Sequence, residues 1–466
     1  MKLLFLILFL VVLPYDAVAQ LNLFDGTLSG GIESNFALYT DGSYGSNNYL
    51  KMDYVKGKFS AGLQIEYYPT PMLGYAPGLK GVGFTGKYLS WNADTWSVAI
   101  GDFYEQFGTG LTLRSWEDRN LGWNNSLGGG RVTLQSKNGL FSTKLLFGFP
   151  RENLSYSSSK VAGSEVTFQF NGITLSGSVV DKIYHGENDL SGSALFQYDK
   201  GGFSGKAEYV IKKGGGNAQT LSLNYASKKI STSLTLRRVK KMTDRLGMNY
   251  IPSLSQEQTY MLASLNPYMS FTEGEIGGAA DLFWSLKKWK IHLSGSMIFA
   301  LPSALANYDH CRLAYRDLNI DAEHRWSNRF KTTFFVSIQE MSPSYGDRKA
   351  TNAQNVFVVD GIYRFNKKTS LRVQVQYLYS QELTRDWMAG LVELGFSPHW
   401  NIHISDMFNH GDTKEHYYEG GISYTYSTFK GTLSYGHQRS GYICSGGVCR
   451  WQPEYTGFLA RLNYNF

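Results

Sequence analysis

The chain has 466 residues, a formal net charge of +7, 42% hydrophobic residues and 18% charged residues. No apolar stretch after the N-terminal one is long enough for a membrane-spanning helix, so any membrane crossing would be built from strands. The basic residues are spread along the chain rather than clustered in a patch, which argues against nucleic acid as a partner.

Residues 1–19 have the features of a secretory signal peptide. A short positive region precedes the apolar run Leu3 to Leu13, and Ala17-Val18-Ala19 supplies a small-x-small cleavage site. The alternative, an uncleaved helix, is disfavoured because the run is shorter than the ~20 residues that span a bilayer. We expect cleavage before Gln20, no lipid anchor because no Cys follows the site, and a single outer-membrane barrel domain at residues 20–466.

The mature sequence repeats one unit, in which two alternating runs of strand length flank a tight polar turn. Phe59 to Tyr67 alternates apolar residues with small or polar ones, and Leu371 to Tyr379 does the same. Because the side chains of a strand point alternately to two faces, this pattern predicts a chain of β-hairpins. The 50 Gly, 32 Tyr and 28 Phe suit a curved wall with aromatic girdles, although a large soluble β-protein shares part of this composition.

Eleven tight turns separate the alternating runs, and their residues either adopt positive φ easily or are short and polar. They are Lys56-Gly57, Asn92 to Asp94, Asn138-Gly139, Asn171-Gly172, Lys200-Gly201-Gly202, Ser227 to Lys229, Leu286 to Trp289, Trp326 to Arg329, Asn366 to Thr369, Ser397 to Trp400, and Ser427-Thr428. Each of the eleven turns joins two strands, one further strand rises from the N-terminus and one returns at the C-terminus, so the wall should have about 24 strands, within a range of roughly 22 to 26.

These features predict an all-β protein: a closed antiparallel transmembrane β-barrel with short periplasmic turns and longer extracellular loops. One segment does not fit the count. Thr259 to Leu265 also looks like a strand, but a membrane strand there would place all later turns on the wrong side. We therefore place this segment inside a long outer loop from about Lys241 to Glu275.

The predicted outer loop from Tyr104 to Gly128 holds both signs of charge around Trp116. If this loop folds inward, its charged side chains would narrow the lumen and set size and charge selectivity, as constriction loops do. The alternative is a solvated loop held by its own ion pairs, which usually contribute little. The constriction candidates are Arg114, Glu117, Asp118 and Arg119.

The stretch Gly101-Asp102-Phe103-Tyr104-Glu105-Gln106-Phe107-Gly108, followed by Leu113-Arg114-Ser115-Trp116-Glu117-Asp118-Arg119, resembles a family of uncharacterised, porin-like outer-membrane β-barrels from Bacteroidota. The resemblance runs along the mature chain. It implies an outer-membrane location and a barrel fold, and it leaves the activity open. No catalytic residues are carried over from the family.

Several charged residues fall on the predicted inner face of the wall, as judged by alternation with their apolar neighbours. These lumen-lining candidates are Lys206, Glu208, Arg237, Arg364, Arg372 and Arg461. Their slight basic excess would favour anionic solutes weakly through the local field. The alternative is that inward positions of a hydrated barrel simply tolerate charge.

Three cysteines lie in predicted outer loops, so all three should face the outside. Cys444 and Cys449 flank four residues of a Gly-rich loop and could form a disulfide in an oxidising compartment; two free thiols are the main alternative. Cys311 has no predicted partner. A metal site would need more ligands than His310 and His437 supply, so we expect no metal and no cofactor.

The sequence contains scattered pieces of an enzyme site but no recognisable motif. Acid and histidine occur close together in Asp309 with His310, Asp321 with His324, and His403 with Asp406. A hydrolase would need a nucleophile or an activated water as well, brought together with a base and an orienting acid. We therefore expect no enzymatic activity. Sugar stacking on Trp116, Trp123 or Tyr308 is conceivable but has no support beyond the aromatic residues themselves.

The last residues, Tyr455 to Phe466, alternate strictly and end on an aromatic ring. This predicts the final barrel strand. The pattern resembles the C-terminal signature read by the bacterial barrel-assembly machinery, and the residues that would form it are Phe458, Leu462, Tyr464 and Phe466.

The function that fits these features best is an outer-membrane, porin-like channel or transport component that passes small polar solutes by passive diffusion. The alternative is a structural or accessory barrel in an envelope complex, such as one for secretion or surface assembly. It is kept because so wide a barrel needs its loops or a partner to close it. The expected partners are outer-membrane lipid, the barrel-assembly machinery, polar solutes and other envelope proteins.

Overall fold

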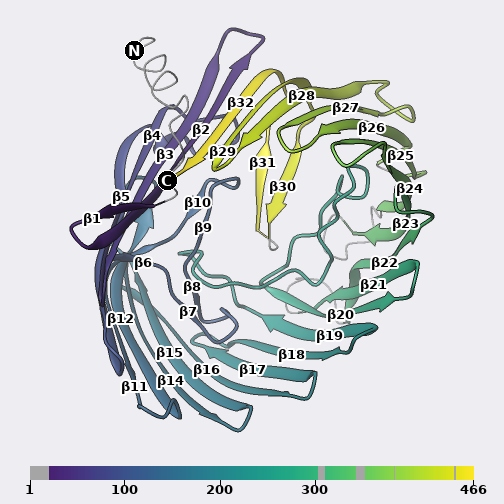
Figure 1. Cartoon of the computed structure of the whole chain (residues 1–466). Coiled ribbons are helices and arrows are strands. Elements are labelled where there is room, and N and C mark those ends of the chain that lie inside the picture. Colours follow the sequence, from purple (N-terminus) through teal and green to yellow (C-terminus); the bar gives the residue numbers. More distant parts are fainter. Residues whose placement is uncertain (1–19, 303–309, 343–351, 383, 446–447) are drawn as a thin grey trace.

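The computed structural model describes residues 20–302, 310–342, 352–382, 384–445 and 448–466. In this part of the chain, 26 strands form one sheet, and two of them, β1 (Leu21–Leu23) and β13 (Ser155–Tyr156), are short additions at the rims. The other 24 form a closed antiparallel wall (Figure 1). The predicted signal peptide, residues 1–19, lies outside the described residues.

The wall strands follow one another in chain order, and the last pairs with the first. They are β2 (Gly26–Tyr39), β3 (Tyr44–Lys56), β4 (Phe59–Thr70), β5 (Gly81–Asn92), β6 (Trp96–Phe103), β11 (Leu127–Gln135), β12 (Phe141–Glu152), β14 (Lys160–Phe170), β15 (Ile173–Tyr184), β16 (Glu187–Lys200), β17 (Phe203–Lys212), β18 (Gly216–Ala226), β19 (Ile230–Lys240), β20 (Gly274–Ser285), β21 (Trp289–Ala300), β22 (Arg312–Arg325), β23 (Phe330–Met341), β24 (Asn352–Arg364), β25 (Thr369–Tyr379), β26 (Trp387–Phe396), β27 (Trp400–Phe408), β28 (His416–Tyr426), β29 (Phe429–Gln438) and β32 (Tyr455–Asn465).

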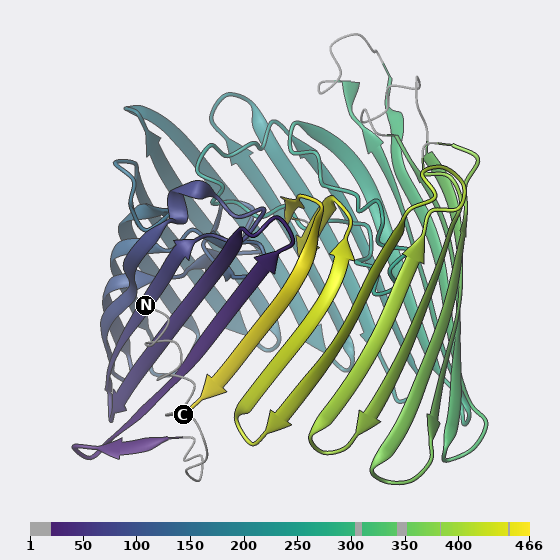
Figure 2. The same ribbon diagram turned by 90° about the horizontal axis from the view of Figure 1, so that it is seen from above.

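One end of the barrel, which we call the turn end, has only short connections. The longer connections lie at the opposite loop end, which also has short ones between β2 and β3, β15 and β16, and β17 and β18 (Figure 2). Each of the eleven predicted turns joins two wall strands at the turn end, from β3–β4 to β28–β29. The predicted count of about 24 strands is therefore confirmed. Thr259 to Leu265 forms no strand and lies between β19 and β20, as the count required.

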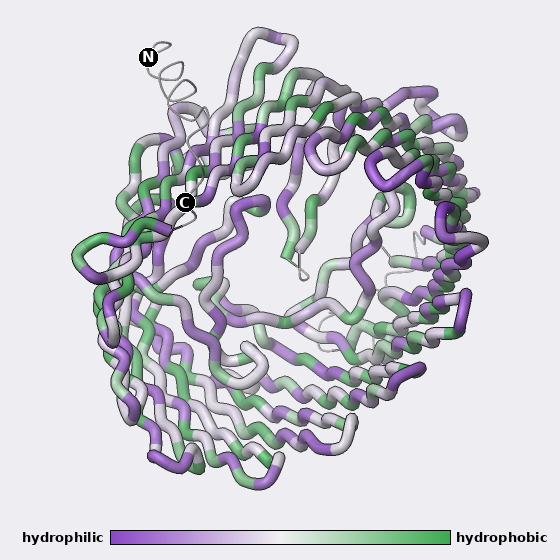
Figure 3. Tube along the Cα trace, viewed as in Figure 1, coloured by the Kyte–Doolittle hydropathy of each residue, from purple (hydrophilic) through white to green (hydrophobic). Residues whose placement is uncertain are grey.

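The wall alternates between an apolar outer face and a polar inner face (Figure 3). On the outer face Ile404 is 62% exposed and Phe458 is 51% exposed, whereas the inner-face residues Gln354 and Gln376 are buried. Apolar side chains that stay exposed on a folded wall are expected where lipid replaces water. No helix in the described part of the chain has the length and hydrophobicity needed to cross a membrane.

Large aromatic side chains gather near the turn end on the outer face. Trp91, Trp96, Trp284, Trp326 and Trp400 border turn-end connections and are all exposed. Tryptophan is favoured at a membrane interface because its ring is apolar while its indole N–H can still reach water. This girdle agrees with the aromatic-rich composition of the chain.

Strand β32 closes the barrel by pairing with both β29 and β2. At its end, Gly30 and Phe466 exchange two backbone hydrogen bonds of 2.8 and 3.0 Å. The four residues of the predicted assembly signature lie on the outer face of this strand or continue it. The rings of Tyr464 and Phe466 lie next to each other, with centroids 6.2 Å apart.

Gly101, in strand β6, occupies a backbone conformation that favours glycine. Its φ is +108°, and a Cβ there would clash with the carbonyl oxygen of Lys87 on β5. Gly101 also pairs with Gly129 on β11, so glycines line both sides of this tight part of the wall. The close backbone approach depends on the missing side chain.

We expect Gly101→Ala to lower the free energy of unfolding by about 1–3 kcal/mol, because it adds a clash in a left-handed conformation. Denaturant titration of the refolded barrel would measure the loss. Gly139→Ala is the matched control for positive φ alone, since Gly139 has φ +70° and nothing within 4 Å of its Cβ position. Equal effects at the two positions would contradict the role of the close approach.

Candidate functional site

Three segments fold into the barrel instead of staying at its rim (Figure 1). Inner loop 1 is residues 104–126, between β6 and β11, and inner loop 2 is residues 241–273, between β19 and β20. The third, the inner hairpin, consists of β30 (Gly441–Ser445) and β31 (Val448–Gln452). Inward folding was one of two alternatives for inner loop 1. For the other two segments the sequence predicted outer loops.

Inner loop 1 carries short strand pairs, β7 (Gln106–Phe107) with β8 (Leu113–Arg114) and β9 (Glu117–Asp118) with β10 (Trp123–Asn124). Apolar residues fix it to the wall. Phe107 and Leu113 are fully buried in a cluster with Val161 of β14 and Val180 of β15. Burying such side chains on the inner wall stabilises the inward position of the loop.

Carboxylates of the wall bind the backbone of inner loop 1. Glu165 accepts a 2.8 Å hydrogen bond from the backbone N–H of Gly108, and Glu208 accepts one of 2.8 Å from the N–H of Thr109. The hydroxyl of Thr109 also donates to Glu208. Glu208, a predicted lumen-lining residue, therefore positions the loop rather than facing solute.

The four constriction candidates lie in inner loop 1, but they do not form one charged ring. Arg119 makes ion pairs with Glu33 of β2 at 2.8 Å and with Glu117 at 3.4 Å. Arg114 lies instead over the Tyr250 ring of inner loop 2, 3.8 Å from the ring centroid. Asp118 accepts hydrogen bonds from two backbone N–H groups that follow it in the loop.

Inner loop 2 covers the inner wall from β19 towards β26. Its apolar residues Leu262 and Leu265 are buried against Val356, Val358 and other wall residues. This explains the strand-like pattern of Thr259 to Leu265, because the apolar side chains of that segment anchor a loop. Backbone hydrogen bonds join the two inner loops, from Arg114 N to Met248 O and from Tyr250 N to Gly110 O.

A buried ion pair fixes the start of inner loop 2. Asp244 pairs with Lys182 of β15, and it accepts hydrogen bonds from the backbone N–H groups of Leu246 (3.0 Å) and Met248 (2.9 Å). Burial by itself would raise the pKa of Asp244, but the charge of Lys182 and these hydrogen bonds outweigh it and hold the pKa below its ordinary value of 3.8.

We expect the contribution of this ion pair to depend on pH. Because the folded-state pKa of Asp244 is lowered, the stabilisation is fully present above the ordinary pKa and is lost as the pH falls through the lowered value. Asp244→Asn should remove it at every pH. At neutral pH the variant should be cleaved by trypsin after Arg245 while the wild type is protected, as read by mass spectrometry.

Asp94→Asn is the control. It makes the same chemical change at an exposed residue of a turn-end connection, away from the lumen. Hydrogen exchange of residues 241–273, measured at neutral and at strongly acidic pH, would test the direction of the pH dependence. Protection of the wild type should fall at strongly acidic pH. Equal protection of the wild type and Asp244→Asn at neutral pH would contradict the role of the pair.

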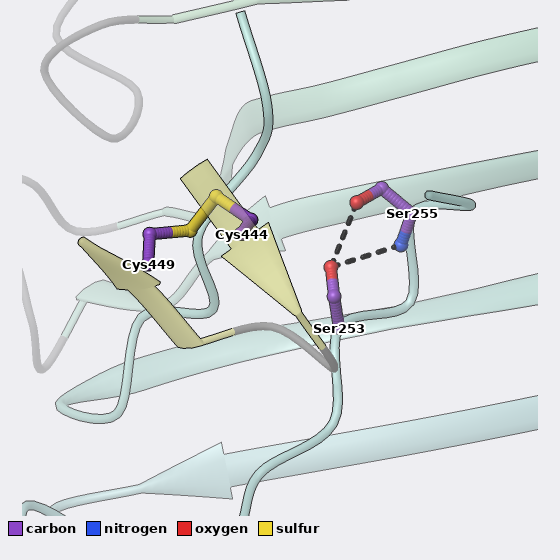
Figure 4. Close-up of a disulfide and its surroundings, with 4 residues drawn as sticks. All are labelled: Ser253, Ser255, Cys444 and Cys449. Atoms are coloured by element: carbon purple, nitrogen blue, oxygen red, sulfur yellow. Dashed lines mark hydrogen bonds between the residues drawn. A yellow bond between two sulfur atoms is a disulfide. The ribbon is translucent and has the colours of Figure 1, made fainter. Parts of the chain in front are cut away.

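The inner hairpin is closed by a disulfide between Cys444 and Cys449 (Figure 4). Arg450 donates to the backbone oxygens of Asn120 in inner loop 1 and of Leu73, each at 3.2 Å. At the base of the hairpin, Arg439 donates to the backbone oxygen of Leu265 in inner loop 2 at 2.9 Å. These contacts explain why the hairpin turns inward, although the sequence placed both cysteines in an outer loop.

The other lumen-lining candidates lie on the inner face. Arg237 is buried and paired with Glu275, and Arg372 binds Asp360 at 2.6 Å. Lys206 is half-buried, whereas Arg364, at the turn end of β24, and Arg461, in the middle of β32, are exposed. The neighbouring acids Glu275 and Asp360 cancel part of the basic excess inferred from sequence, which weakens the expected preference for anions.

Sequence reasoning missed another buried ion pair, between Glu66 of β4 and Arg151 of β12. The two guanidinium N–H groups lie 2.8 and 2.7 Å from the two carboxylate oxygens. The strands are separated in the sheet by β5, β6 and β11, so the wall must bend sharply for the pair to form. Glu66 falls on the polar face of the run Phe59 to Tyr67, which was the only signal in the sequence.

This ion pair borders a cavity of about 270 Å³ between inner loop 1 and the wall, which Arg119 and Trp123 also line. Trp123 and Trp116 are two of the sugar-stacking candidates. The guanidinium carbon of Arg114 lies 4.8 Å from the centroid of the Trp116 ring. Tyr308, the third, lies outside the described residues.

The paired acids and histidines of the sequence are not assembled into a site. Asp321 lies on the inner face of β22, whereas His324 lies on the outer face between Trp289 and Trp326. His403 binds Glu419 and Asp406 binds His416, so these two residues have separate partners. Asp309 lies outside the described residues, and Cys311 is exposed. Among the described residues, no group of three His, Cys, Asp or Glu could hold a metal ion.

The chain matches one family model and several solved structures. A family model described as "Family of unknown function (DUF6029)" matches residues 1–466. The translocation pore of the P pilus usher (PapC) matches with a TM-score of 0.47 and 11% identity, over 94% of this chain and 99% of that chain. A triple mutant of Rhodopseudomonas blastica porin matches with a TM-score of 0.33 and 11% identity, over 63% and 92%. Among curated proteins there is no match.

Proposed function

Since the chain belongs to the family of unknown function DUF6029, we propose its activity from the geometry of its lumen: a porin-like channel of the bacterial outer membrane that passes small polar solutes by diffusion. The observation that carries the proposal is the inward folding of three segments against a polar inner wall. Fixed loops inside a wide barrel restrict its cross-section and so set a size limit without an energy source.

In this proposal the turn end faces the periplasm and the loop end faces the outside. Residues 1–19 are a cleaved signal peptide, and the barrel-assembly machinery reads the C-terminal signature on β32. The proposal also includes a source in Bacteroidota, which the family resemblance implies. The partners are outer-membrane lipid on the outer face and polar solutes in the lumen.

The charge distribution favours neutral polar solutes over strongly charged ones. Most buried bases of the inner wall contact an acid directly, as in Arg151 with Glu66 and Lys182 with Asp244. Paired charges of opposite sign produce a weak field a short distance away, so the lumen should discriminate little between small anions and cations.

A second candidate is an accessory barrel within an envelope complex, such as one for secretion or surface assembly. The observation that favours it is the firm anchoring of the inner segments by buried apolar clusters and ion pairs. A lumen sealed by such contacts would conduct nothing, and the barrel would then serve as a platform for other envelope proteins.

Single-channel recording of the purified, refolded chain in a planar bilayer tests the proposal. We expect stable conductance steps and a reversal potential near zero under a salt gradient. Arg119→Glu would add a third carboxylate beside those of Glu33 and Glu117. The resulting negative charge should shift the reversal potential towards cation selectivity. Arg329→Glu, at an exposed turn-end position, is the matched control and should change little.

Silence from a barrel shown to be folded would reject the channel. Co-purification of envelope proteins at fixed stoichiometry with such a silent barrel would support the accessory role. Conductance steps with no change of selectivity in Arg119→Glu would keep the channel and reject inner loop 1 as its constriction.

A further inference from the structure

Exposed basic residues gather along one part of the turn end (Figure 2). They lie in the four connections that join β18 to β19, β20 to β21, β22 to β23 and β24 to β25, and none of these connections contains an acidic residue. We call this set the basic arc. Its members are Lys228, Lys229, Lys287, Lys288, Arg329, Lys367 and Lys368. Bases that are spread along the sequence are thus brought to one edge of the barrel by the fold.

The four connections are neighbours around the wall, because each strand from β18 to β25 pairs with the next. The backbone N–H of Arg325 donates to the backbone oxygen of Lys288 at 2.9 Å, and that of Arg364 donates to the oxygen of Arg329 at 2.7 Å. Arg325 and Arg364 are also exposed, so they extend the row of bases. Since paired strands lie about 4.8 Å apart, successive connections follow one another at roughly 10 Å along the rim.

The positive charge of the basic arc is not neutralised within the described part of the protein, where its members make no ion pair. Glu323, an acid near the same end of β22, is already bound by Lys331 at 2.5 Å and by Lys290 at 3.8 Å. In contrast, Lys58, in another turn-end connection, pairs with Asp94 at 2.9 Å. The arc therefore presents several unpaired cations side by side.

The basic arc lies directly beside the aromatic girdle of the outer face. Trp284, on β20, precedes Lys287 and Lys288, and Trp326 lies in the same connection as Arg329. The two indole rings belong to side chains that are 43% and 53% exposed. Such rings lie at the level of the lipid headgroups in a bilayer, and flexible basic side chains next to them reach the phosphate groups.

We propose that the basic arc is a binding surface for anionic phospholipids of the leaflet around the turn end. Phosphate oxygens accept hydrogen bonds from the ammonium and guanidinium groups, and the acyl chains lie against exposed apolar residues of the same strands, such as Leu234, Leu293 and Phe334. A zwitterionic headgroup carries its own cation and gains less from the arc. A lipid fits better than an acidic protein, because the girdle places this edge in the headgroup layer.

Electron paramagnetic resonance of spin-labelled lipids tests the proposal on the whole refolded barrel. Traces of labelled phosphatidylglycerol, an anion, or of labelled phosphatidylcholine, a zwitterion, are added to phosphatidylcholine vesicles that contain the barrel. The immobilised fraction of each label gives their relative association constants. We expect about threefold stronger association of phosphatidylglycerol at low ionic strength, averaged over the perimeter of the barrel. In ~1 M salt, where the Debye length is about 3 Å, most of this preference should disappear.

Two variants remove charge from the basic arc in steps. Lys287→Gln with Lys288→Gln removes two charges, and the addition of Lys367→Gln with Lys368→Gln removes two more. We expect the preference for phosphatidylglycerol to fall at each step, to below about 1.5-fold in the four-site variant. The substitutions lie in exposed connections, so the variants should insert and fold like the wild type.

Lys56→Gln with Lys58→Gln is the matched control for the first step. It removes the same charge from two exposed lysines at the same end of the barrel, but these lysines pair with Asp25 and Asp94. The control should therefore keep most of the wild-type preference. An equal loss in the control and in the first arc variant would assign the effect to net charge and overturn the proposal.

This inference rests on the proposed function in one respect, that the barrel spans a membrane, and the results separate the two. A barrel that conducts but holds both lipids equally would overturn the lipid surface and leave the channel. A silent barrel that prefers phosphatidylglycerol through the arc would support the lipid surface and reject the channel. A preference that is unchanged in the four-site variant would place the lipid elsewhere and overturn the proposal.

Discussion

Arg151→Met is expected to lower the free energy of unfolding by about 3–5 kcal/mol, because it leaves the carboxylate of Glu66 buried without its cation. Both side chains are almost fully buried, with 3% of Arg151 and 2% of Glu66 exposed. Glu66 would retain hydrogen bonds from Gln64, Thr85 and Tyr68, but none of these donors carries a charge.

The loss should be smaller when both charges are removed. Glu66→Gln combined with Arg151→Met takes away the carboxylate together with the guanidinium, so no unpaired charge remains in the wall. Unfolding of the refolded barrel in guanidinium chloride, monitored by tryptophan fluorescence, would compare the free energies of unfolding of the single and double variants. Arg329→Met, at an exposed turn-end position, should change the free energy of unfolding by less than about 0.5 kcal/mol.

If the single and double variants lost the same free energy, the unpaired charge would not be the cause. The effect would then come from lost packing or from the hydrogen bond that Arg151 donates to the backbone oxygen of Asn153. The comparison matters for function because the same pair borders the cavity beneath inner loop 1.

Removing the inner hairpin is expected to raise the single-channel conductance several-fold without unfolding the barrel. The deletion would take out residues 441–452 and join their neighbours through two glycines. The wall strands β29 and β32 pair directly along their length, so closure of the barrel does not depend on the hairpin. The conductance should rise because the hairpin occupies part of the lumen (Figure 1).

Two milder changes serve as controls for this deletion. Cys444→Ser with Cys449→Ser leaves the hairpin attached to both wall strands and to inner loop 1, so its conductance should stay close to that of the wild type. Arg450→Ala removes the hydrogen bonds to Asn120 and Leu73, so the hairpin should move more and the current should become noisier. A deletion that folds but conducts like the wild type would show that the hairpin does not restrict the path.

The wall could be predicted from sequence because its signals are local. A strand needs only alternation over about ten residues, and a tight turn needs only residues that accept its φ values. Asn171-Gly172 joins β14 and β15, for example, with positive φ at both residues. Counting such turns was enough to place Thr259 to Leu265 outside the wall.

The lumen could be predicted only in part. Alternation places Arg237 and Glu208 on the inner face, but it cannot identify their partners. Glu275 lies 38 residues from Arg237 in the chain, and Thr109 lies 99 residues from Glu208. The basic excess inferred from sequence was overestimated for this reason, because the acids that cancel it come from other strands and from loops.

The sequence by itself determined that this protein is a closed barrel of about 24 strands, at which end the eleven tight turns lie, and which face of each strand is apolar. Those properties follow from short-range periodicity and from the need to satisfy every backbone polar group in a membrane. Only the tertiary structure decided which connections fold inward. That choice depends on contacts between residues far apart in the chain, such as Phe107 with Val161 or Arg450 with Asn120, which no local pattern in the sequence specifies.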